Sequence, residues 1–540
     1  MKLPRSRPEA GRRLCGAVLI SLPALTPSVW AADVAGFGVA GAGVAGTSVA
    51  GAGVAGTSVA GAGGTTIQSR LTLQTLVTDN VAMVAGERDA GVVMTVSPGI
   101  TMSSRAGLIT GKLDYALSGI AYFGGGQPDR LQQSLNATGS AELIQHVLKV
   151  DVTALISQVS NSALGAQTVD TSLASTNRTE VSTLSVSPTL QGHVGSFASF
   201  VIRATATDSR SRHSTLGDAR QIGGSAVLTG LSGGKLNWSA NLVSQSTNFQ
   251  GTTSAGNDDQ AWLGLSYQYD VDLSASLHGG VERSNYQIGT NQTSSIYGGS
   301  VNWVPSPRVR ASGEWMHHVY GDTHSVNVEY RLARSALRYV DTQTASQVPQ
   351  LSATSLGSAY DVLFLQYASI EPDPVKRDQL VRAFLSANGI SPDAQINRAF
   401  LTNAPTLARS QQLSYSASGV RTTLIFSLQR SVTGRLGVSS IYGGDLGRFS
   451  SVTQGGVSGS LSHQLTPISN VGISLSWFRN NGNGGNSALG NSVQMRTATA
   501  SWSTQLARRT SLGVSLRHAQ SQGATGYQEN AALVNLVQLF

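Results

Sequence analysis

The chain of 540 residues has one cysteine and few charged side chains, with Asp, Glu, Lys and Arg making up only 12%. The cysteine, Cys15, lies in a segment that we expect to be removed, so the mature chain should have no disulfide, thiol chemistry or cysteine-bound metal. After Trp30 there is no run of about 18 apolar residues, the length that a transmembrane helix needs. Any membrane-spanning segment must therefore be a β-strand.

The N-terminus has the three parts of an export signal. A basic stretch precedes the apolar core Leu14–Leu25, and Val29-Trp30-Ala31 supplies a small-residue cleavage site. We therefore predict a signal peptide over residues 1–31. Its removal takes away five basic residues and one acid, which lowers the formal net charge from +8 to +4. The basic balance is thus partly a property of the signal, and we infer no nucleic-acid partner from it.

Residues 32–66 are rich in Gly, Ala and Val and contain a repeat of ten residues. Val39–Ser48 reads VAGAGVAGTS, Val49–Ser58 repeats it, and a partial copy follows. Such repeats could form a short β-solenoid-like or adhesive segment. Because three copies bury almost no surface, we expect a disordered leader instead.

The clearest structural signal is the stretch Ala261–Val281, in which side-chain character alternates with period two. Leu263, Leu265 and Tyr267 fall on one face, and small polar residues fall on the other. This alternation is typical of a β-hairpin. An apolar face that ends in aromatic residues favours a strand with lipid on one side and water on the other.

Similar runs recur from Ile67 onward and give 22 candidate strands, separated by alternately long and short gaps. The fold class predicted is all-β, a closed antiparallel transmembrane β-barrel of about 22 strands, within a range of roughly 18 to 24, over residues 67–540. Among the last candidates are Ser416–Arg430 and Gly434–Gly444. Closure leaves no strand edge whose backbone groups would lie unpaired in hydrocarbon.

Residues 346–415 break the period of two, and we expect a small helical insertion there, in one long loop of the barrel. Asp373 and Pro374 can start a helix that ends at Gly389, and Ser391-Pro392 can start a second one that carries Ile396, Phe400 and Leu401. Strand parity places the insertion on the outer side. It could be a lid or partial plug of the lumen, or a cap that lies on the surface.

Strand alternation also predicts which side chains face the lumen, namely Gln268, Ser274, His278, Glu282, Asn327, Glu329 and Arg331. A wider set of wall charges adds Arg283, Arg308 and Arg310, which could screen one another or select an anionic or sugar-rich solute. Trp303, Tyr330 and Trp477 are candidates for an interfacial aromatic girdle.

Catalytic and metal chemistry find little support. His317 and His318 are neighbours on a strand and point to opposite faces, so with His324 we expect them to be polar lumen or loop residues, not metal ligands. No Gly-x-Ser-x-Gly turn gives a serine nucleophile a special place. We predict no enzyme activity, no cofactor and no metal.

Several short motifs, in their order along the chain, resemble one protein family. They are Thr78-Asp79-Asn80, Val96-Ser97-Pro98-Gly99-Ile100, Leu113-Asp114-Tyr115, Trp303-Val304-Pro305-Ser306-Pro307-Arg308 and the insert from Asp373-Pro374 to Phe400-Leu401-Thr402. The chain in this respect resembles the PEP-CTERM system-associated outer-membrane β-barrel proteins, which accompany exosortase and exopolysaccharide genes of Gram-negative bacteria. The resemblance implies an outer-membrane protein with a part in exopolysaccharide export or surface assembly, and no catalytic residues to carry over.

The resemblance and the barrel pattern together imply a set of partners: outer-membrane lipid, the barrel-assembly machinery, polysaccharide and other exopolysaccharide-export proteins. Phe540 is the terminal aromatic residue expected of an assembly signal, although Gln538 stands where an apolar residue is usual. The polar lumen alone would equally suit a general porin or nutrient channel, which is the alternative function.

Overall fold

The structure is a computed structural model of the whole chain. It describes residues 59–61, 64–104, 107–212, 214, 216, 218–231, 234–250, 256–286, 290–346, 364, 377, 400–437, 443–485, 492–523 and 526–540. The predicted signal peptide and most of the predicted leader lie outside these residues. Within them, no helix is long and apolar enough to cross a membrane.

The described chain is almost entirely β-strand. The first half contains β1 (Val59–Gly61), β2 (Thr65–Thr78), β3 (Gly91–Ser104), β4 (Ile109–Phe123), β5 (Arg130–Ile144), β6 (Leu148–Ser160), β7 (Arg178–Val194), β8 (Ala198–Ser211), β9 (Ala219–Gly230), β10 (Leu236–Phe249), β11 (Gly256–Asp270) and β12 (Leu273–Ser284).

The second half continues the same series and adds one short helix. Its elements are β13 (Gln292–Ser306), β14 (Val309–His318), β15 (Gly321–Arg331), β16 (Ser335–Ser346), β17 (Thr406–Ser418), β18 (Thr422–Arg435), α3 (Gly444–Arg448), β19 (Ser451–Thr466), β20 (Ser469–Asn483), β21 (Ser492–Ala507), β22 (Thr510–Gln522) and β23 (Tyr527–Leu539).

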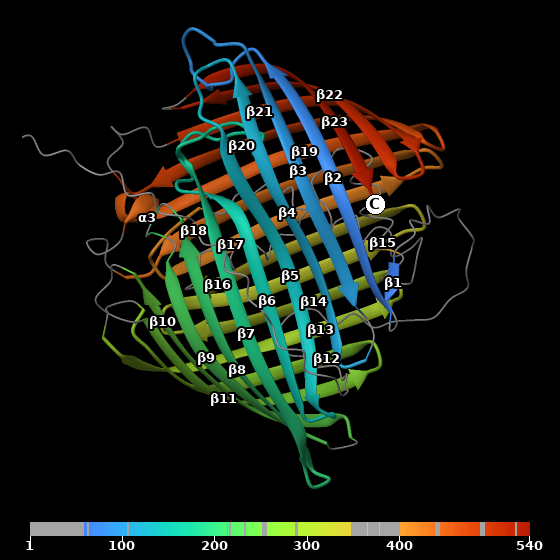
Figure 1. Cartoon of the computed structure of the whole chain (residues 1–540). Helices are drawn as coiled ribbons and strands as arrows, with labels where there is room; N and C mark the ends of the chain where they lie inside the picture. Colours follow the sequence, from blue (N-terminus) through green and yellow to red (C-terminus); the bar gives the residue numbers. More distant parts are fainter. Residues whose placement is uncertain are drawn as a thin grey trace, which may run out of the picture.

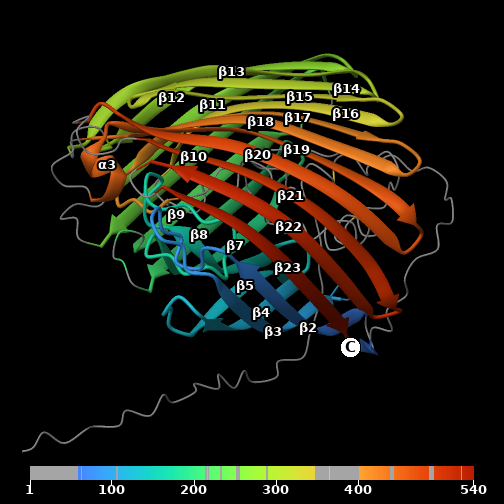
Figure 2. The ribbon, with the colours of Figure 1, turned by 90° about the horizontal axis from the view of Figure 1, so that it is seen from above.

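Strands β2 to β23 form a closed antiparallel barrel of 22 strands, as the sequence predicted. Each strand pairs with the next one along the chain, and β23 pairs with β2 from Arg70↔Leu539 to Thr78↔Ala531 to close the ring. The short strand β1 pairs with the start of β2, with Val59 opposite Ile67. The end of the predicted leader therefore forms a strand. Figures 1 and 2 show the two walls of the barrel from the side and from above.

The connections are sorted by length between the two ends of the barrel. At the short-turn end, two or a few residues join neighbouring strands, as Val271 and Asp272 do between β11 and β12. The long-loop end carries the connections β2–β3, β6–β7, β16–β17 and β18–β19, although Val319 and Tyr320 make a tight turn there too. In Figure 1 α3 lies at the left, near the long-loop end, and β1 and the C-terminus lie toward the right.

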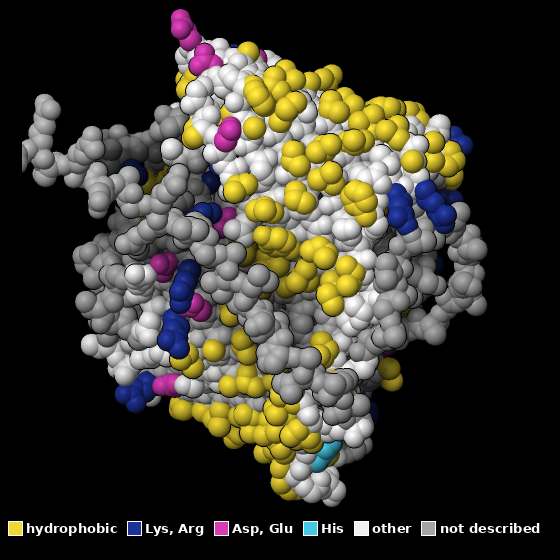
Figure 3. Space-filling model, viewed as in Figure 1, with side chains coloured by type: hydrophobic (Ala, Val, Ile, Leu, Met, Phe, Trp, Pro, Cys, Tyr) yellow, Lys and Arg dark blue, Asp and Glu magenta, His cyan; other side chains and the backbone are white. Residues whose placement is uncertain are grey.

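The outer surface of the barrel is apolar. Outward side chains include Leu263 at 67% exposure, Leu265 at 52% and Leu277 at 73%. Large apolar patches of this kind are rare on a surface that faces water. Figure 3 shows hydrophobic side chains across the middle of one face, with Lys, Arg, Asp and Glu mainly toward its sides. Such an apolar band is the exterior of a barrel embedded in lipid.

Aromatic side chains mark the short-turn end of this band. Trp238, Tyr267, Trp303 and Tyr330 are exposed within a few residues of that end. Two of the predicted girdle residues, Trp303 and Tyr330, belong to this group. Trp477, by contrast, lies in the middle of β20, so its assignment to a strand end was wrong.

The strand count is right although two of the predicted strands near residue 430 are wrong. Strand β17 occupies Thr406–Ser418, which the sequence analysis placed mostly in the insertion, and the predicted strand Ser416–Arg430 runs across the real turn at 419–421. The predicted strand Gly434–Gly444 does not appear in the described part of that range, because β18 ends at Arg435, residues 436 and 437 are not in a strand, and α3 begins at Gly444. One missed strand and one false strand cancelled in the total.

The insertion is accordingly shorter than predicted and lies between β16 and β17, at the long-loop end. Of the helix predicted from Asp373 to Gly389, the structure describes only residue 377, which is helical. The second helix cannot include Phe400 and Leu401, because Phe400 makes an isolated β-bridge with Ser160 and the Leu401 amide donates to the Ser160 carbonyl at 3.0 Å.

Candidate functional site

The inner wall of the barrel at β17 and β18 is lined by uncharged polar side chains. Those that point inward are buried: Ser410, Gln412, Ser414, Ser416, Ser427, Gln429 and Ser431. Within the described residues, Ser410 Oγ, Ser427 Oγ and Gln429 Nε2 have no hydrogen-bond partner. Strand alternation explains the set, because each serine or glutamine alternates with an outward residue such as Leu413, Tyr415 or Leu428. The three unpartnered atoms have almost no accessible surface, so a polar solute would reach them only where the atoms that cover them move aside.

The connection between β6 and β7, residues 161–177, folds inward and lies against the inner wall. We call it the inward loop. Its backbone oxygens accept hydrogen bonds from inward side chains of distant strands, including Asn480 Nδ2 to Ala163 O at 2.7 Å and the Tyr527 hydroxyl to Gln167 O at 2.9 Å. Because these partners lie on β20 and β23, the loop follows the wall of the arc from β20 round to β7.

One carboxylate of the inward loop joins a charged network on the wall. Asp170 Oδ2 lies 3.4 Å from Arg517 Nη1 on β22, and Arg517 Nη2 lies 3.0 Å from Glu529 Oε1 on β23. Thr78 donates to the same Glu529 oxygen at 3.1 Å, and Gln74 donates to Asp170 at 3.3 Å. The Glu529 side chain is fully buried and that of Arg517 is 10% exposed, so each charge depends on its partners.

The middle of the inward loop is also held by a cation and an apolar anchor. Arg130 Nη2 donates to the carbonyl oxygens of Thr171, Ser172 and Leu173 at 2.7, 3.0 and 2.9 Å. Leu173 is fully buried in a cluster with Leu76, Val81, Val93, Ile120 and Ala531. Arg130 begins β5, and the cluster joins Leu173 to β2, β3 and β4 and, through Ala531, to β23 on the other side of the barrel closure.

A second long-loop segment clamps the start of the inward loop. Asp445 of α3 accepts hydrogen bonds from Ser162 Oγ and from the Ala163 amide, both at 2.7 Å. Its pKa is raised by burial, and the hydrogen bonds from Ser162 and Ala163 oppose that shift. Leu446 and Ala163 pack in one buried cluster with Phe400, Ala404 and Val452. Three segments of the long-loop end therefore meet at one point: the inward loop, α3 and residues 400–404.

The structure places all seven predicted lumen residues on the inward face, but at different depths. Gln268, Ser274 and Arg331 lie at the short-turn end, and Arg331 Nη2 donates to Pro307 O at 3.4 Å. Asn327 and Glu329 both face Arg338, whose Nε lies 3.2 Å from Asn327 Oδ1 and 3.7 Å from Glu329 Oε1.

His278 and Glu282 lie further toward the long-loop end on β12. Glu282 is fully buried and accepts hydrogen bonds from His318 Nδ1 at 3.2 Å and from the Val319 amide at 2.9 Å.

Inward charges are largely neutralised in pairs. Arg70 forms a bidentate contact with Asp114 at 2.6 and 3.0 Å, and Asp151 lies between Lys149 and Arg203 at 3.1 and 3.0 Å. With the Arg517 and Arg338 contacts, these pairs fit the interpretation of wall charges that screen one another. They leave no strong field of one sign along the described wall.

Some sequence-based assignments of wall charges and histidines are wrong. Arg283 follows the inward Glu282 and is exposed on the outer face, and Arg308 lies in the turn between β13 and β14. His318 points inward, but His317 and His324 face outward, where they lie 2.6 Å from Asp322 and 3.1 Å from Asp341. In the described part of the chain, no group of three or more His, Cys, Asp or Glu side chains is placed to hold a metal ion.

Sequence reasoning missed the residues that fix the inward loop: Arg130, Asp170, Asp445, Arg517 and Glu529. Each is one charged residue in an otherwise ordinary strand or loop. Arg130 and Arg517 contact residues at least 12 positions away, and the contacts of Asp170 with Arg517 and of Asp445 with Ser162 span 347 and 283 residues, so no local spacing could have identified them.

Comparison with known proteins gives distant structural likeness only. No model of a protein family matches the chain, and no curated protein matches it. The siderophore receptor PirA from Pseudomonas aeruginosa aligns over 88% of this chain and 80% of its own, with 9% identity and a TM-score of 0.43. The FrpB iron transporter from Neisseria meningitidis (F5-1 variant) covers 88% and 82%, with 10% identity and a TM-score of 0.45. OccK11 (OpdR) from Pseudomonas aeruginosa aligns over 88% of this chain and 96% of its own, with 10% identity and a TM-score of 0.31. Likeness of this degree assigns the chain neither a family nor a ligand.

Proposed function

We propose that this chain is an outer-membrane conduit for a hydroxyl-rich solute, and more specifically that it serves the export or surface assembly of an exopolysaccharide. The observation that carries the proposal is the inner wall of β17 and β18, where serine and glutamine side chains point inward and three of their polar atoms are unpartnered. A sugar chain that displaced the atoms covering this wall would offer hydroxyl groups to pair with the three unpartnered atoms.

The charge arrangement also favours a weakly charged solute. Because the inward charges of the described wall are mostly paired, they cannot form the ring of one sign that selects ions in charged pores. The barrel would then select its solute by hydrogen bonding and by the width of the lumen. The inward loop occupies part of that width near the long-loop end.

The polysaccharide part of the proposal rests on the resemblance of the motifs to the PEP-CTERM system-associated barrels. The outer membrane is the proposed location, because closed barrels with an apolar exterior are the β-structures that bacterial outer membranes contain. The proposed partners are outer-membrane lipid, the barrel-assembly machinery, polysaccharide and other exopolysaccharide-export proteins.

Deletion and complementation test the proposal. A strain without the gene should lose surface polysaccharide and accumulate its precursor, and the wild-type gene should restore both. The variant Ser414→Leu/Ser416→Leu, which makes the inner wall apolar, should restore less polysaccharide than Thr504→Leu, in which the lost hydroxyl faces outward on β21. Unchanged polysaccharide in the deletion strain would contradict the exopolysaccharide role.

A general porin or nutrient channel is the second candidate, favoured by the same polar wall and by the loop folded against it. In planar bilayers such a protein should show steady conductance as purified, and its deletion should leave surface polysaccharide intact. The two candidates therefore differ in both measurements.

A further inference from the structure

The outward face of the barrel carries a group of arginines near the long-loop end, within a surface that is otherwise apolar. They are Arg409 on β17, Arg430 on β18, Arg479 on β20 and Arg496 on β21. All four are exposed, and each lies within about five residues of the long-loop end of its strand. Alternation fixes their direction: the neighbours Ser410, Gln429 and Met495 are buried on the inner side.

Two of these arginines flank a glycine. Arg430 lies directly opposite Gly455 on β19, and Gly455 lies directly opposite Arg479. Neighbouring strands are about 4.8 Å apart, so the two arginine Cα atoms are separated by about 10 Å with no side chain between them. A Cβ at Gly455 would meet only the Gln429 carbonyl oxygen, at 3.7 Å. The row is therefore an open notch between two guanidinium groups.

The positive charge of the group is mostly uncompensated. Arg409 pairs with Asp341 at 2.7 Å. Within the described residues, Arg430, Arg479 and Arg496 form no ion pair with any carboxylate. Arg479 Nε donates to Asn481 Oδ1 at 3.0 Å, which orients the guanidinium and leaves its charge intact. Three cations beside a lipid phase require an anion, since an unpaired charge there is costly.

The surface on the membrane side of the arginines suits acyl chains. Below Arg430 and Arg479, the next outward row toward the short-turn end contains Leu428, Val457 and Trp477, and Arg496 continues it on β21, directly opposite Trp477. Beside this row the wall has an apolar hollow of about 740 Å³. The surface is hollowed there because the small side chains of Ala498, Ala500 and Ala532 lie between larger outward side chains. Ile473 and Leu516 are among these larger ones.

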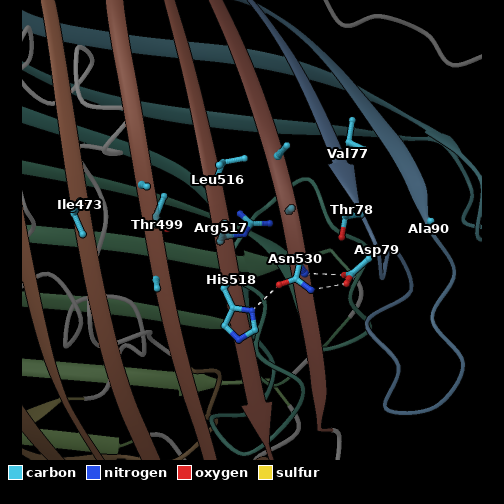
Figure 4. A pocket seen from close by; sticks show the side chains of 14 residues that line it. Val77, Thr78, Asp79, Ala90, Ile473, Thr499, Leu516, Arg517, His518 and Asn530 are labelled. Carbon is cyan, nitrogen blue, oxygen red and sulfur yellow. Dashed lines mark hydrogen bonds between the residues drawn. The ribbon is translucent and has the colours of Figure 1, made fainter.

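The hollow begins just below the arginines and has one polar end. Ala498 follows Arg496 by two residues on β21, so the hollow starts one outward row below that arginine. Figure 4 shows Asp79, Asn530 and His518 joined by hydrogen bonds along this end. The one carboxylate there, Asp79, is neutralised by Arg88 at 3.1 Å.

We propose that this face binds a lipid with a phosphorylated headgroup and several acyl chains, such as a lipid of the outer leaflet. A phosphate occupies the notch over Gly455 between Arg430 and Arg479, Arg496 contacts a second anionic group, and an acyl chain lies in the alanine-floored hollow. Arginine suits this role because its planar donors form charge-assisted pairs with phosphate oxygens. A free anion would need no apolar surface, so the adjoining hollow favours a lipid as its source. The inference depends on the membrane location and not on what the barrel transports.

Binding of defined lipids to the delipidated full-length protein tests the proposal. The probes are diphosphorylated lipid A, the same lipid with both phosphates removed, and inorganic phosphate, each added to protein in a neutral detergent. Native mass spectrometry would count bound lipid, and the unfolding temperature would report stabilisation. We expect lipid A to bind and to raise the unfolding temperature, the dephosphorylated lipid to bind at least tenfold more weakly, and inorganic phosphate to have no effect at millimolar concentration.

Two variants locate the site. Arg430→Ser/Arg479→Ser should weaken lipid A binding at least tenfold, whereas Arg421→Ser/Arg508→Ser, which removes the same charge from the short-turn end, should not. Gly455→Leu should fill the notch without changing charge and weaken binding, whereas Gly313→Leu, outward on β14 with open space around it, should not.

Binding that ignores the lipid phosphates, or that survives both Arg430→Ser/Arg479→Ser and Gly455→Leu, would overturn the proposal. Equal stabilisation by inorganic phosphate would identify a bare anion site and overturn the lipid assignment.

Discussion

Asp170 and Arg517 are 347 residues apart in the sequence, yet Asp170 Oδ2 lies 3.4 Å from Arg517 Nη1 inside the barrel. The contact joins the inward loop to β22, and Glu529 shares the same arginine. The inward loop is therefore attached to the wall through Arg517, the same cation that neutralises the buried Glu529 of the wall.

Replacing Arg517 by Met should destabilise the protein, because it leaves the buried Glu529 without its cation. Loss of one partner from a buried pair costs about 3–5 kcal/mol. Thermal or urea unfolding in detergent micelles would measure the change. Glu529→Gln added to Arg517→Met should recover part of the loss. As a control, Arg210→Met removes a cation that is 76% exposed and should change stability by less than about 1 kcal/mol. Equal effects of the two single variants would contradict a structural role for Arg517.

The clamp between α3 and the inward loop should depend on pH. Burial raises the pKa of Asp445 above its ordinary value of 3.8, so the clamped state binds more protons than the released state between the two pKa values. The clamp is then strongest at a pH below 3.8 and weakens as the pH rises through that window. Hydrogen exchange of the amides of residues 161–165, corrected for the intrinsic pH dependence, would report the opening equilibrium.

The matched variant for the clamp is Asp445→Asn. It retains an oxygen that can accept from Ser162 Oγ or the Ala163 amide but does not titrate. Its opening equilibrium should therefore be independent of pH in the same window. If Asp445→Asn kept the wild-type slope, another group would be responsible for the pH dependence.

The direction of the hairpin β11–β12 gives a sharp test of the wall. Leu265 is 52% exposed on the outer face, and Ser266 points into the barrel. Arginine on the lipid face costs about 2–4 kcal/mol near the midplane, whereas the inner face is polar. Folding into phospholipid vesicles across a urea series should therefore be impaired by Leu265→Arg far more than by Ser266→Arg. Similar folding midpoints would overturn the assignment of the two faces.

The same hairpin shows which features the sequence can predict. Its apolar and polar residues alternate without interruption, and the turn at Val271 and Asp272 is short. The alternation therefore predicts the two strands and their outward faces, and the order of strands along the chain predicts the end of the barrel at which the turn lies. Strand β17 was harder, because Arg409 and Gln411 occupy outward positions where apolar residues are expected. Their polarity has a reason that only the structure supplies: both donate to Asp341 on the neighbouring strand, at 2.7 and 2.9 Å.

The candidate site was less predictable than the wall. Alternation places His278, Glu282 and Glu329 on the inner face, and that inference needs only the strand itself. The inward loop depends on contacts of Arg130, Arg517 and Asp445 with loop atoms that no strand period relates to them. The direction of a side chain could thus be predicted one strand at a time, whereas the contacts that hold the inward loop against the wall could not.

Phe540 offers a test that separates assembly from stability. Its side chain is 57% exposed and its amide donates to the Ser69 carbonyl at 2.9 Å, a backbone contact that a substitution would leave in place. Phe540→Ala should therefore change unassisted folding in detergent little, but should lower the amount of assembled barrel in cells several-fold if the machinery recognises the terminal aromatic. Phe197→Ala is the matched control, since Phe197 is 59% exposed in a turn at the same end of the barrel. Gln538→Leu should raise assembly, because it restores an apolar residue, although it removes two hydrogen bonds: from Thr510 Oγ1 to Gln538 Oε1 at 2.6 Å and from Gln538 Nε2 to Leu539 O at 2.9 Å. Equal cellular levels of Phe540→Ala and Phe197→Ala would show that Phe540 carries no signal.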